Sequence, residues 1–264
     1  MSDRVLGKTF VVTGGASGIG EAISQGLAAE GGNVVVSDLN IEAGRRVAAE
    51  IGSGGGAAIA VHSDVTDRDS VRASLADAAN EFGRIDGYFN NAGMNAPMNF
   101  LDITEDNFML VMRVNALGVL IGIQEAAKQM IAQQKPEQAS PGKIINTASI
   151  AGRTGFPKFA PYSAAKAAVI SLTQAAARDL APQGITVNGF APGVVATPLW
   201  DKLDADLARM GAADAGFDSM AADILLGRPA QPADIVPTAL FLAAADSDYI
   251  TGQIIAIEGG MILV

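Results

Sequence analysis

Short runs rich in β-branched residues alternate with alanine-rich segments of helical periodicity along the whole chain of 264 residues. Such alternation is typical of a parallel sheet whose successive strands are joined by helices. Strands are expected at residues 9–13, 33–37, 57–61, 85–90, 143–148, 186–190 and 253–258. Helices are expected at residues 18–30, 41–51, 68–82, 105–133, 161–180 and 232–245. The pattern predicts an α/β fold, a doubly wound seven-stranded parallel sheet with helices on both faces, in which residues 1–264 form a single domain.

One segment, about residues 192–228, interrupts this alternation. It contains proline, glycine, several aspartates and Trp200, and it has no strand pattern. A long insertion inside a compact domain usually covers a binding site. We therefore expect residues 192–228 to form a substrate-covering loop.

Composition excludes several classes of chemistry. The chain has no cysteine, which rules out disulfides, thiolate metal sites and cysteine nucleophiles. Its only histidine, His62, ends an apolar run and is interpreted as structural. No metal ligands are assigned, and acid/base chemistry near neutral pH must come from tyrosine, lysine or carboxylates.

Charge and hydropathy restrict the partners. The net charge of −10 disfavours nucleic acid and anionic membranes as partners. No apolar run approaches the length that spans a bilayer, and the N-terminus lacks the apolar core of a signal peptide. A cytoplasmic protein is expected.

A glycine-rich turn follows the first expected strand. Gly14, Gly18 and Gly20 have the spacing that lets backbone N–H groups approach a pyrophosphate at the start of a helix, as in a Rossmann-like fold. Asp38 ends the next strand, where a carboxylate can bond both ribose hydroxyls and repel a 2′-phosphate. NAD is therefore favoured over NADP. The alternative is that Asp38 only caps the following helix.

A tyrosine and a lysine lie one helical turn apart. Tyr162 and Lys166 share one face of a helix that is expected to begin near Pro161. A nearby ammonium and the positive helix end should lower the pKa of the phenol and make it an efficient general acid/base. Such a pair is common by chance and needs support from other residues.

These residues together resemble the short-chain dehydrogenase/reductase family, over residues 8–260. The resemblance depends on Thr13-Gly14-x-x-x-Gly18-x-Gly20, Asn91-Ala92-Gly93, Asn115, Ser149, Tyr162-x-x-x-Lys166, and Pro192-Gly193 followed by Thr197. Ala148 is a small departure, since many relatives have serine at that position. The order and spacing of the whole set make the resemblance specific.

The resemblance implies roles for four catalytic residues. Tyr162 would exchange a proton with the substrate oxygen, and Lys166 would lower its pKa and bond the nicotinamide ribose. Ser149 would bond the same substrate oxygen. Asn115 would hold a water in a proton relay, or bond backbone in the core; the two roles are compatible.

The resemblance and the strand ends also give the binding residues. Cofactor contacts are expected from Gly14, Ser17, Gly18, Ile19, Gly20, Asp38, Asp64, Val65, Asn91, Ala92, Gly93, Tyr162, Lys166, Pro192, Gly193, Val195 and Thr197. Substrate contacts are expected from Ser149, Ala151, Phe156, Phe159, Tyr162 and Trp200, with Met94, Asn95, Val194 and Phe217 as further candidates.

Three functions are compatible with these features. The first is an NAD-dependent oxidoreductase of a small secondary alcohol or ketone (polyol, vicinal diol or hydroxy-ketone), because Asp38 and residues 197–201 resemble the sorbitol, galactitol and butanediol dehydrogenase branch. The second is a 3-oxoacyl thioester reductase, which normally takes NADP and meets an acidic carrier protein. The third, a non-catalytic nucleotide-binding sensor, would leave the catalytic set unexplained.

The apolar surface predicts self-association. The expected helices at 105–133 and 161–180 are apolar around more of their circumference than one sheet face can cover, and residues 259–264 form an apolar tail. Together with the family's usual assembly, this predicts a homotetramer.

Overall fold

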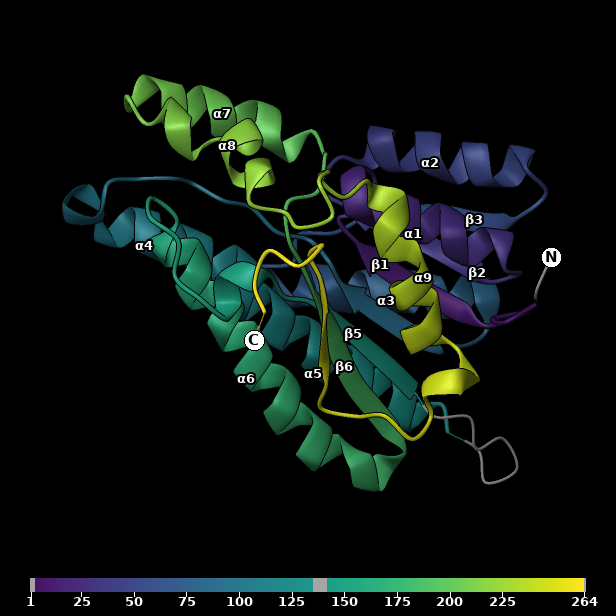
Figure 1. Ribbon diagram of the computed structural model, residues 1–264. Helices are drawn as coiled ribbons and strands as arrows, with labels where there is room; N and C mark the ends of the chain where they lie inside the picture. The colour runs from purple at the N-terminus through teal and green to yellow at the C-terminus, as the bar shows by residue number, and fades with distance from the viewer. Residues whose placement is uncertain (1–2, 135–141, 264) are drawn as a thin grey trace.

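The computed structural model describes residues 3–134 and 142–263. Its strands form one sheet in the order β3-β2-β1-β4-β5-β6-β7, in which all neighbouring strands are parallel (Figure 1). The strands are β1 Thr9–Thr13, β2 Asn33–Asp38, β3 Ala57–His62, β4 Gly87–Asn90, β5 Gly142–Thr147, β6 Ile185–Pro192 and β7 Ile254–Ile257. The predicted doubly wound, seven-stranded parallel sheet is confirmed.

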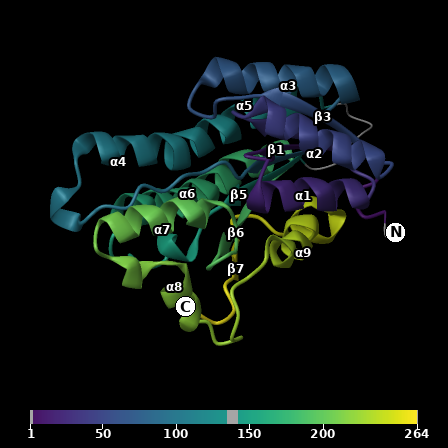
Figure 2. The same cartoon turned by 90° about the horizontal axis from the view of Figure 1, so that it is seen from above.

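Helices cover both faces of this sheet. The α-helices of the described residues are α1 Gly18–Ala29, α2 Ile41–Ser53, α3 Arg68–Phe82, α4 Glu105–Met112, α5 Gly118–Ala132, α6 Ala160–Leu180, α7 Leu199–Arg209, α8 Phe217–Ala222 and α9 Pro232–Ala243. Seen from above, α1 and α9 lie on one side of the strands, and α3 and α5 lie on the other (Figure 2). The chain reverses direction across the sheet between β1 and β4, which are neighbours.

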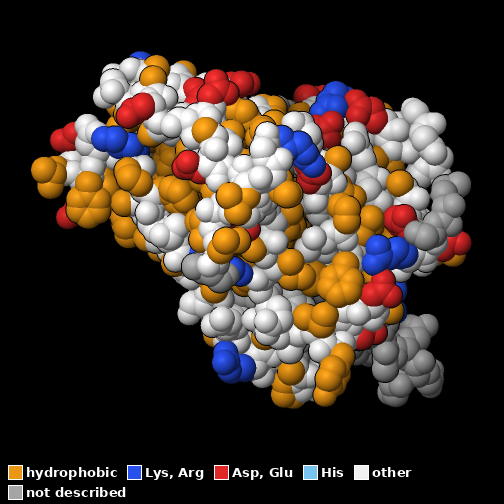
Figure 3. Space-filling model, in the orientation of Figure 1, with side chains coloured by type: hydrophobic (Ala, Val, Ile, Leu, Met, Phe, Trp, Pro, Cys, Tyr) orange, Lys and Arg blue, Asp and Glu red, His pale blue; other side chains and the backbone are white. Residues whose placement is uncertain are grey.

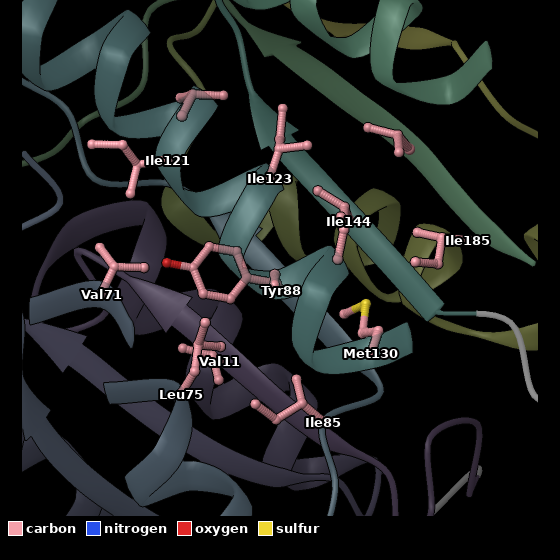
Figure 4. Packing of buried hydrophobic residues seen from close by; sticks show 14 of the residues in the cluster. Val11, Val71, Leu75, Ile85, Tyr88, Ile121, Ile123, Met130, Ile144 and Ile185 are labelled. Atoms are coloured by element: carbon pink, nitrogen blue, oxygen red, sulfur yellow. The ribbon is translucent and has the colours of Figure 1, made fainter. Parts of the chain in front are cut away.

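Each face of the sheet has its own apolar core. Val11 and Tyr88 pack with α3, α5 and α6, whereas their neighbours Val12 and Phe89 pack with α1, α2 and α9. Figure 4 shows Tyr88 among Val11, Val71 and Leu75 on the first face. Because both faces are covered, the strands consist of nearly continuous apolar residues, as parallel sheets require.

The long helix expected at 105–133 is interrupted. It consists of α4, a π-helical turn η2 at Arg113–Leu117, and α5. The strand ends also differ from the prediction, most of all in β4, which begins at Gly87 and not at residue 85, and in β6, which continues to Pro192 and not to residue 190. The π turn contains Asn115, one of the predicted catalytic residues.

The segment 192–228 is mostly helical, so the expectation of a loop was wrong. After the last residue of β6, Val195 forms an isolated bridge with Ala230, and α7, a short turn at Ala213–Ala215 and α8 follow. The helical spacing of Leu199, Leu203 and Leu207 explains this, because the last two are buried. In Figure 1, α7 and α8 lie above the carboxyl edge of the sheet, where they can cover a ligand.

The stretch Glu105–Ala132 is long and apolar enough to cross a membrane, judged by length and composition alone. The expectation that no such run exists was therefore wrong. This stretch carries the π turn, and 44% of its most apolar window is buried inside the protein. Core helices of soluble proteins pass the same test, so the finding is weak evidence for a membrane.

Candidate active site

The glycine-rich turn lies at the carboxyl end of β1, at the point where the chain reverses direction across the sheet. Gly14 and Gly18 have left-handed φ values of +61° and +53°. A Cβ atom on Gly20 would lie 2.1 Å from the Gly14 carbonyl oxygen. Only glycine fits these positions, and the cradle at the start of α1 therefore suits a dinucleotide pyrophosphate.

Hydrogen bonds fasten the end of β4 to this turn. Thr13 Oγ1 accepts from the backbone N–H groups of Asn91 and Ala92, at 3.0 and 3.1 Å. Asn91 Nδ2 in turn donates to the Thr13 and Gly14 carbonyls, at 3.1 and 3.4 Å. Asn91 thus fixes the strand end beside the turn.

Asp38 ends β2 beside the same turn. Its Oδ2 accepts from the Ala16 N–H at 3.1 Å, and its Oδ1 accepts from the Asn40 N–H at 2.9 Å. The cap of α2 is Asn40, whose side chain accepts from the Ala43 N–H. The alternative interpretation of Asp38 as the helix cap was therefore wrong.

A groove of about 570 Å³ runs along these strand ends. Thirteen of the expected cofactor residues line it: Gly14, Ser17, Gly18, Ile19, Asp38, Asp64, Val65, Asn91, Ala92, Gly93, Tyr162, Lys166 and Thr197. Gly20 lies behind the groove in α1, whereas Pro192, Gly193 and Val195 line a neighbouring cavity. Among the groove residues that sequence reasoning missed are Val114, on the π turn that interrupts the expected helix, and Lys202, on α7, where no helix was expected.

The neighbouring cavity, about 110 Å³, lies beneath α7. All six expected substrate residues line it: Ser149, Ala151, Phe156, Phe159, Tyr162 and Trp200. Of the further candidates, Asn95 and Val194 line it, while Met94 lines the groove. Phe217 packs edge-on against Trp200, with ring centroids 5.4 Å apart. The spacing of α7 and α8 could have revealed Leu203 and Met220, which also line the cavity.

Helix α6 carries the tyrosine and the lysine. Pro161 is in its first turn, and Tyr162 lines both the groove and the cavity. Lys166 is 3% exposed, and its Nζ donates to the Thr147 carbonyl at 2.7 Å. Burial lowers the pKa of Lys166 to about 8. The ammonium of Lys166 therefore loses its proton much closer to neutral pH than an exposed lysine does.

The expected lowering of the pKa of Tyr162 is not found. Burial raises the pKa of Tyr162 to about 12, and a hydrogen bond with Ser149 opposes this shift. Lys166 Nζ lies 5.5 Å from the centroid of the tyrosine ring and is held by Thr147, so its charge does not offset the loss of water around the phenol. The phenol is thus protonated in this geometry, which suits donation of a proton to a carbonyl oxygen.

Asn115 is fully buried in the π turn. Its Nδ2 donates to the Val111 carbonyl at 2.9 Å, which a regular α-helix would pair with the backbone N–H of residue 115. It also donates to the Met94 carbonyl at 2.8 Å, and its Oδ1 accepts from the Met94 N–H at 3.2 Å. Asn115 therefore holds the chain that follows Gly93, as the core interpretation predicted.

Comparison with known proteins agrees with this geometry. A family model described as enoyl-(acyl carrier protein) reductase matches residues 14–262. A diacetyl reductase [(S)-acetoin forming] of Staphylococcus epidermidis is 40% identical over 261 residues, covering 97% of this chain and 99% of that protein. An L-2,3-butanediol dehydrogenase of Corynebacterium glutamicum is 40% identical over 263 residues, with 97% and 99% coverage. The chain belongs to the short-chain dehydrogenase/reductase family.

Solved structures of this family share the whole fold. A short-chain type dehydrogenase/reductase from Mycobacterium marinum has a TM-score of 0.89 and 34% identity, covering 100% of this chain and 98% of that one. A structure from Beutenbergia cavernae with NADP bound at low occupancy has a TM-score of 0.86 and 33% identity, with 99% coverage of both chains. This short-chain dehydrogenase/reductase is thus an oxidoreductase of alcohols and carbonyl compounds, which confirms the resemblance and excludes the non-catalytic sensor.

The buried lysine of this short-chain dehydrogenase/reductase should make stability depend on pH. The pKa of Lys166 falls from 10.5 to about 8 on folding, so between these pH values the unfolded chain binds more protons than the folded one. The free energy of unfolding of the wild type, relative to that of Lys166→Met, should rise across this window by at most about 3 kcal/mol. Urea unfolding at a series of pH values measures the difference; a flat profile would contradict desolvation of the ammonium.

Proposed function

We propose that the protein transfers hydride between NAD(H) and a small secondary alcohol or ketone, such as a vicinal diol or hydroxy-ketone, with Tyr162 as general acid/base. One observation carries this proposal: Tyr162 lies in the wall shared by the dinucleotide groove and the small cavity. A proton donor at that boundary can reach an oxygen whose carbon faces the groove.

The residues of the site supply positioning and a proton. Bound NADH would provide the hydride. Ser149 and Tyr162, which both line the small cavity, would both bond the substrate oxygen, and the phenol would donate its proton as negative charge develops there. Lys166 would bond the ribose, and Asn115 would keep the chain after Gly93 in place. A water held by Asn115 would complete a proton relay.

NAD is the proposed dinucleotide because of the charges beside the turn. Asp38 lines the groove where the adenosine ribose is expected, and its carboxylate would repel a 2′-phosphate. Arg46 reaches the Ala16 carbonyl at 3.2 Å, but its guanidinium is paired with Glu21 and Glu50 at 2.9 and 2.8 Å. The positive charge of Arg46 beside the turn is thus already neutralised.

The small cavity favours a small substrate. At about 110 Å³ it suits a compact ketone better than the long acyl chain of a 3-oxoacyl thioester. The net charge of −10 also disfavours docking of an acidic carrier protein. The relatives named for diacetyl and butanediol act on compounds of the proposed size.

These small metabolic substrates also support a cytoplasmic location.

We also propose a homotetramer, on the basis of the apolar surface. A groove of about 590 Å³ between α5 and α6 is lined by Leu120, Ile123, Ile131 and Leu172. Figure 3 shows more hydrophobic side chains gathered over α4 and the turn before it. A second copy packed on this side would remove that surface from water.

Light scattering during size exclusion tests the assembly. The expected mass is four times the chain mass of 26.9 kDa. Leu172→Glu places a charge in the α5–α6 groove and should split the tetramer, whereas Leu6→Glu, at a residue 64% exposed outside that groove, should leave it intact. A stable, active wild-type monomer at micromolar concentration would reject the tetramer.

Replacing the proton donor tests the reaction. Tyr162→Phe and Lys166→Ala should each lower kcat for ketone reduction by about 10²-fold or more, because each removes part of the acid/base system. NADH binding should survive better in Tyr162→Phe, since Lys166 also contacts the ribose. Steady-state rates with diacetyl and fluorescence titration with NADH measure both effects. A near-wild-type kcat in Tyr162→Phe would rule out the mechanism.

Removing the carboxylate of Asp38 tests the cofactor. The wild type should prefer NADH over NADPH by more than about tenfold in kcat/KM, which corresponds to about 1.4 kcal/mol. Asp38→Ala should narrow this preference because the charge repulsion is lost. Asp214→Ala, in the short turn between α7 and α8, is the matched control. An unchanged preference in Asp38→Ala would show that selectivity lies elsewhere.

A further inference from the structure

The substrate cavity has a buried amide in its wall. Asn95 lies just after the β4 end, is 6% exposed, and lines the cavity together with Ser149 and Tyr162. Much of the remaining wall is apolar, with Phe156, Phe159, Leu203 and Met220 among its residues. An amide in such surroundings carries polarity that packing alone does not require.

Only half of this amide has a partner within the protein. Asn95 Oδ1 accepts from the Ala96 N–H at 2.9 Å. No described residue accepts a hydrogen bond from Nδ2, yet Nδ2 is not among the fully enclosed unpaired atoms, so it keeps surface open to the cavity. A donor in largely apolar surroundings is unfavourable while it lacks an acceptor. The free N–H groups therefore suit a ligand that brings an acceptor oxygen.

The other polar side chains of the cavity already have partners or roles. Thr147 Oγ1 donates to Asn91 Oδ1 at 3.3 Å. Ser149 Oγ accepts from the Ala151 N–H at 3.1 Å, and Ser149 and Tyr162 are both assigned to the reacting oxygen. Trp200 belongs to α7, above the sheet edge, whereas Asn95 is fixed by its backbone neighbours next to the sheet. Asn95 is thus the better-placed donor for a second substrate oxygen.

We propose that Asn95 Nδ2 donates a hydrogen bond to the oxygen on the carbon next to the reacting carbonyl, so that Asn95 determines specificity for vicinal diones and hydroxy-ketones. This role presupposes the ketone reductase activity proposed above. While Ser149 and Tyr162 hold the reacting oxygen, the second oxygen of such a substrate would otherwise meet an apolar wall. A ketone with one oxygen makes no use of Asn95.

A pair of substrates isolates this hydrogen bond. The ratio of kcat/KM for diacetyl to that for butanone, with NADH, is measured for the wild type, Asn95→Leu and Asn95→Ala. Diacetyl is the more electrophilic ketone, but this factor cancels when the ratio is compared between variants. The ratio should fall about tenfold or more in both variants, while kcat/KM for butanone stays within about threefold of wild type.

Asn107→Leu is the matched control. Asn107 Nδ2 donates to the Ala96 carbonyl at 3.3 Å, so it contacts the same chain segment, but it does not line the cavity. Its ratio should equal that of the wild type; a fall equal to that of Asn95→Leu would assign the effect to a displaced segment and overturn the proposal.

The remaining outcomes also decide. If either Asn95 variant binds NADH and keeps the wild-type ratio of kcat/KM for diacetyl to that for butanone, the proposal is overturned. If both variants lose NADH binding, Asn95 has a structural role, and the proposal is overturned as well. Reduction of neither ketone by the wild type would reject the proposed function itself, and the specificity role of Asn95 with it. If the wild type reduces both diacetyl and butanone and the Asn95 variants keep the wild-type ratio, only the role of Asn95 is rejected.

Discussion

The hydroxyl of Thr13 joins β1 and β4, the two strands between which the chain reverses direction across the sheet, and the dinucleotide groove is built on this junction. It donates to the Phe89 carbonyl and accepts from two backbone N–H groups of the following segment, at 3.0 to 3.1 Å. One hydroxyl has one hydrogen and two lone pairs, so its capacity is fully used. With the ends of β1 and β4 fixed in this way, the backbone of Gly14 can approach that of Ala92, where a Cβ atom would leave no space.

Burial, more than charge pairing, sets the protonation of the site. It raises the pKa of Tyr162 and lowers that of Lys166, so both groups are driven toward their neutral forms. The two pKa values move in opposite directions because the neutral tyrosine keeps its proton and the neutral lysine has lost one. Because the site disfavours both the phenolate and the ammonium, a new hydrogen bond to either ion stabilises that ion more than it would in water. Hydroxyl groups of an alcohol substrate and of the dinucleotide ribose are groups of that kind, because a hydroxyl can donate to a phenolate or accept from an ammonium.

Much of the fold and the site could be predicted from the sequence because periodicity and glycine spacing are local properties. Residues 192–228 were predicted as a loop because their prolines, glycines and aspartates outweighed the helical spacing of Leu199, Leu203 and Leu207. The sign of the pKa shift of Tyr162 depends on which atoms exclude water, which no spacing records. The half-satisfied amide of Asn95 likewise depends on the cavity wall around it.

The π turn around Asn115 has a consequence for the ancestry of the long helix. A π turn accommodates one residue more than a regular turn of helix, so it has the form expected after a single-codon insertion. Loss of that residue would restore regular pairing for the Val111 carbonyl and would shift Asn115 by about 100° around the helix axis, away from Met94. Selection for a straighter and more stable helix would therefore act against the site, and the irregularity is expected to persist for as long as the activity does.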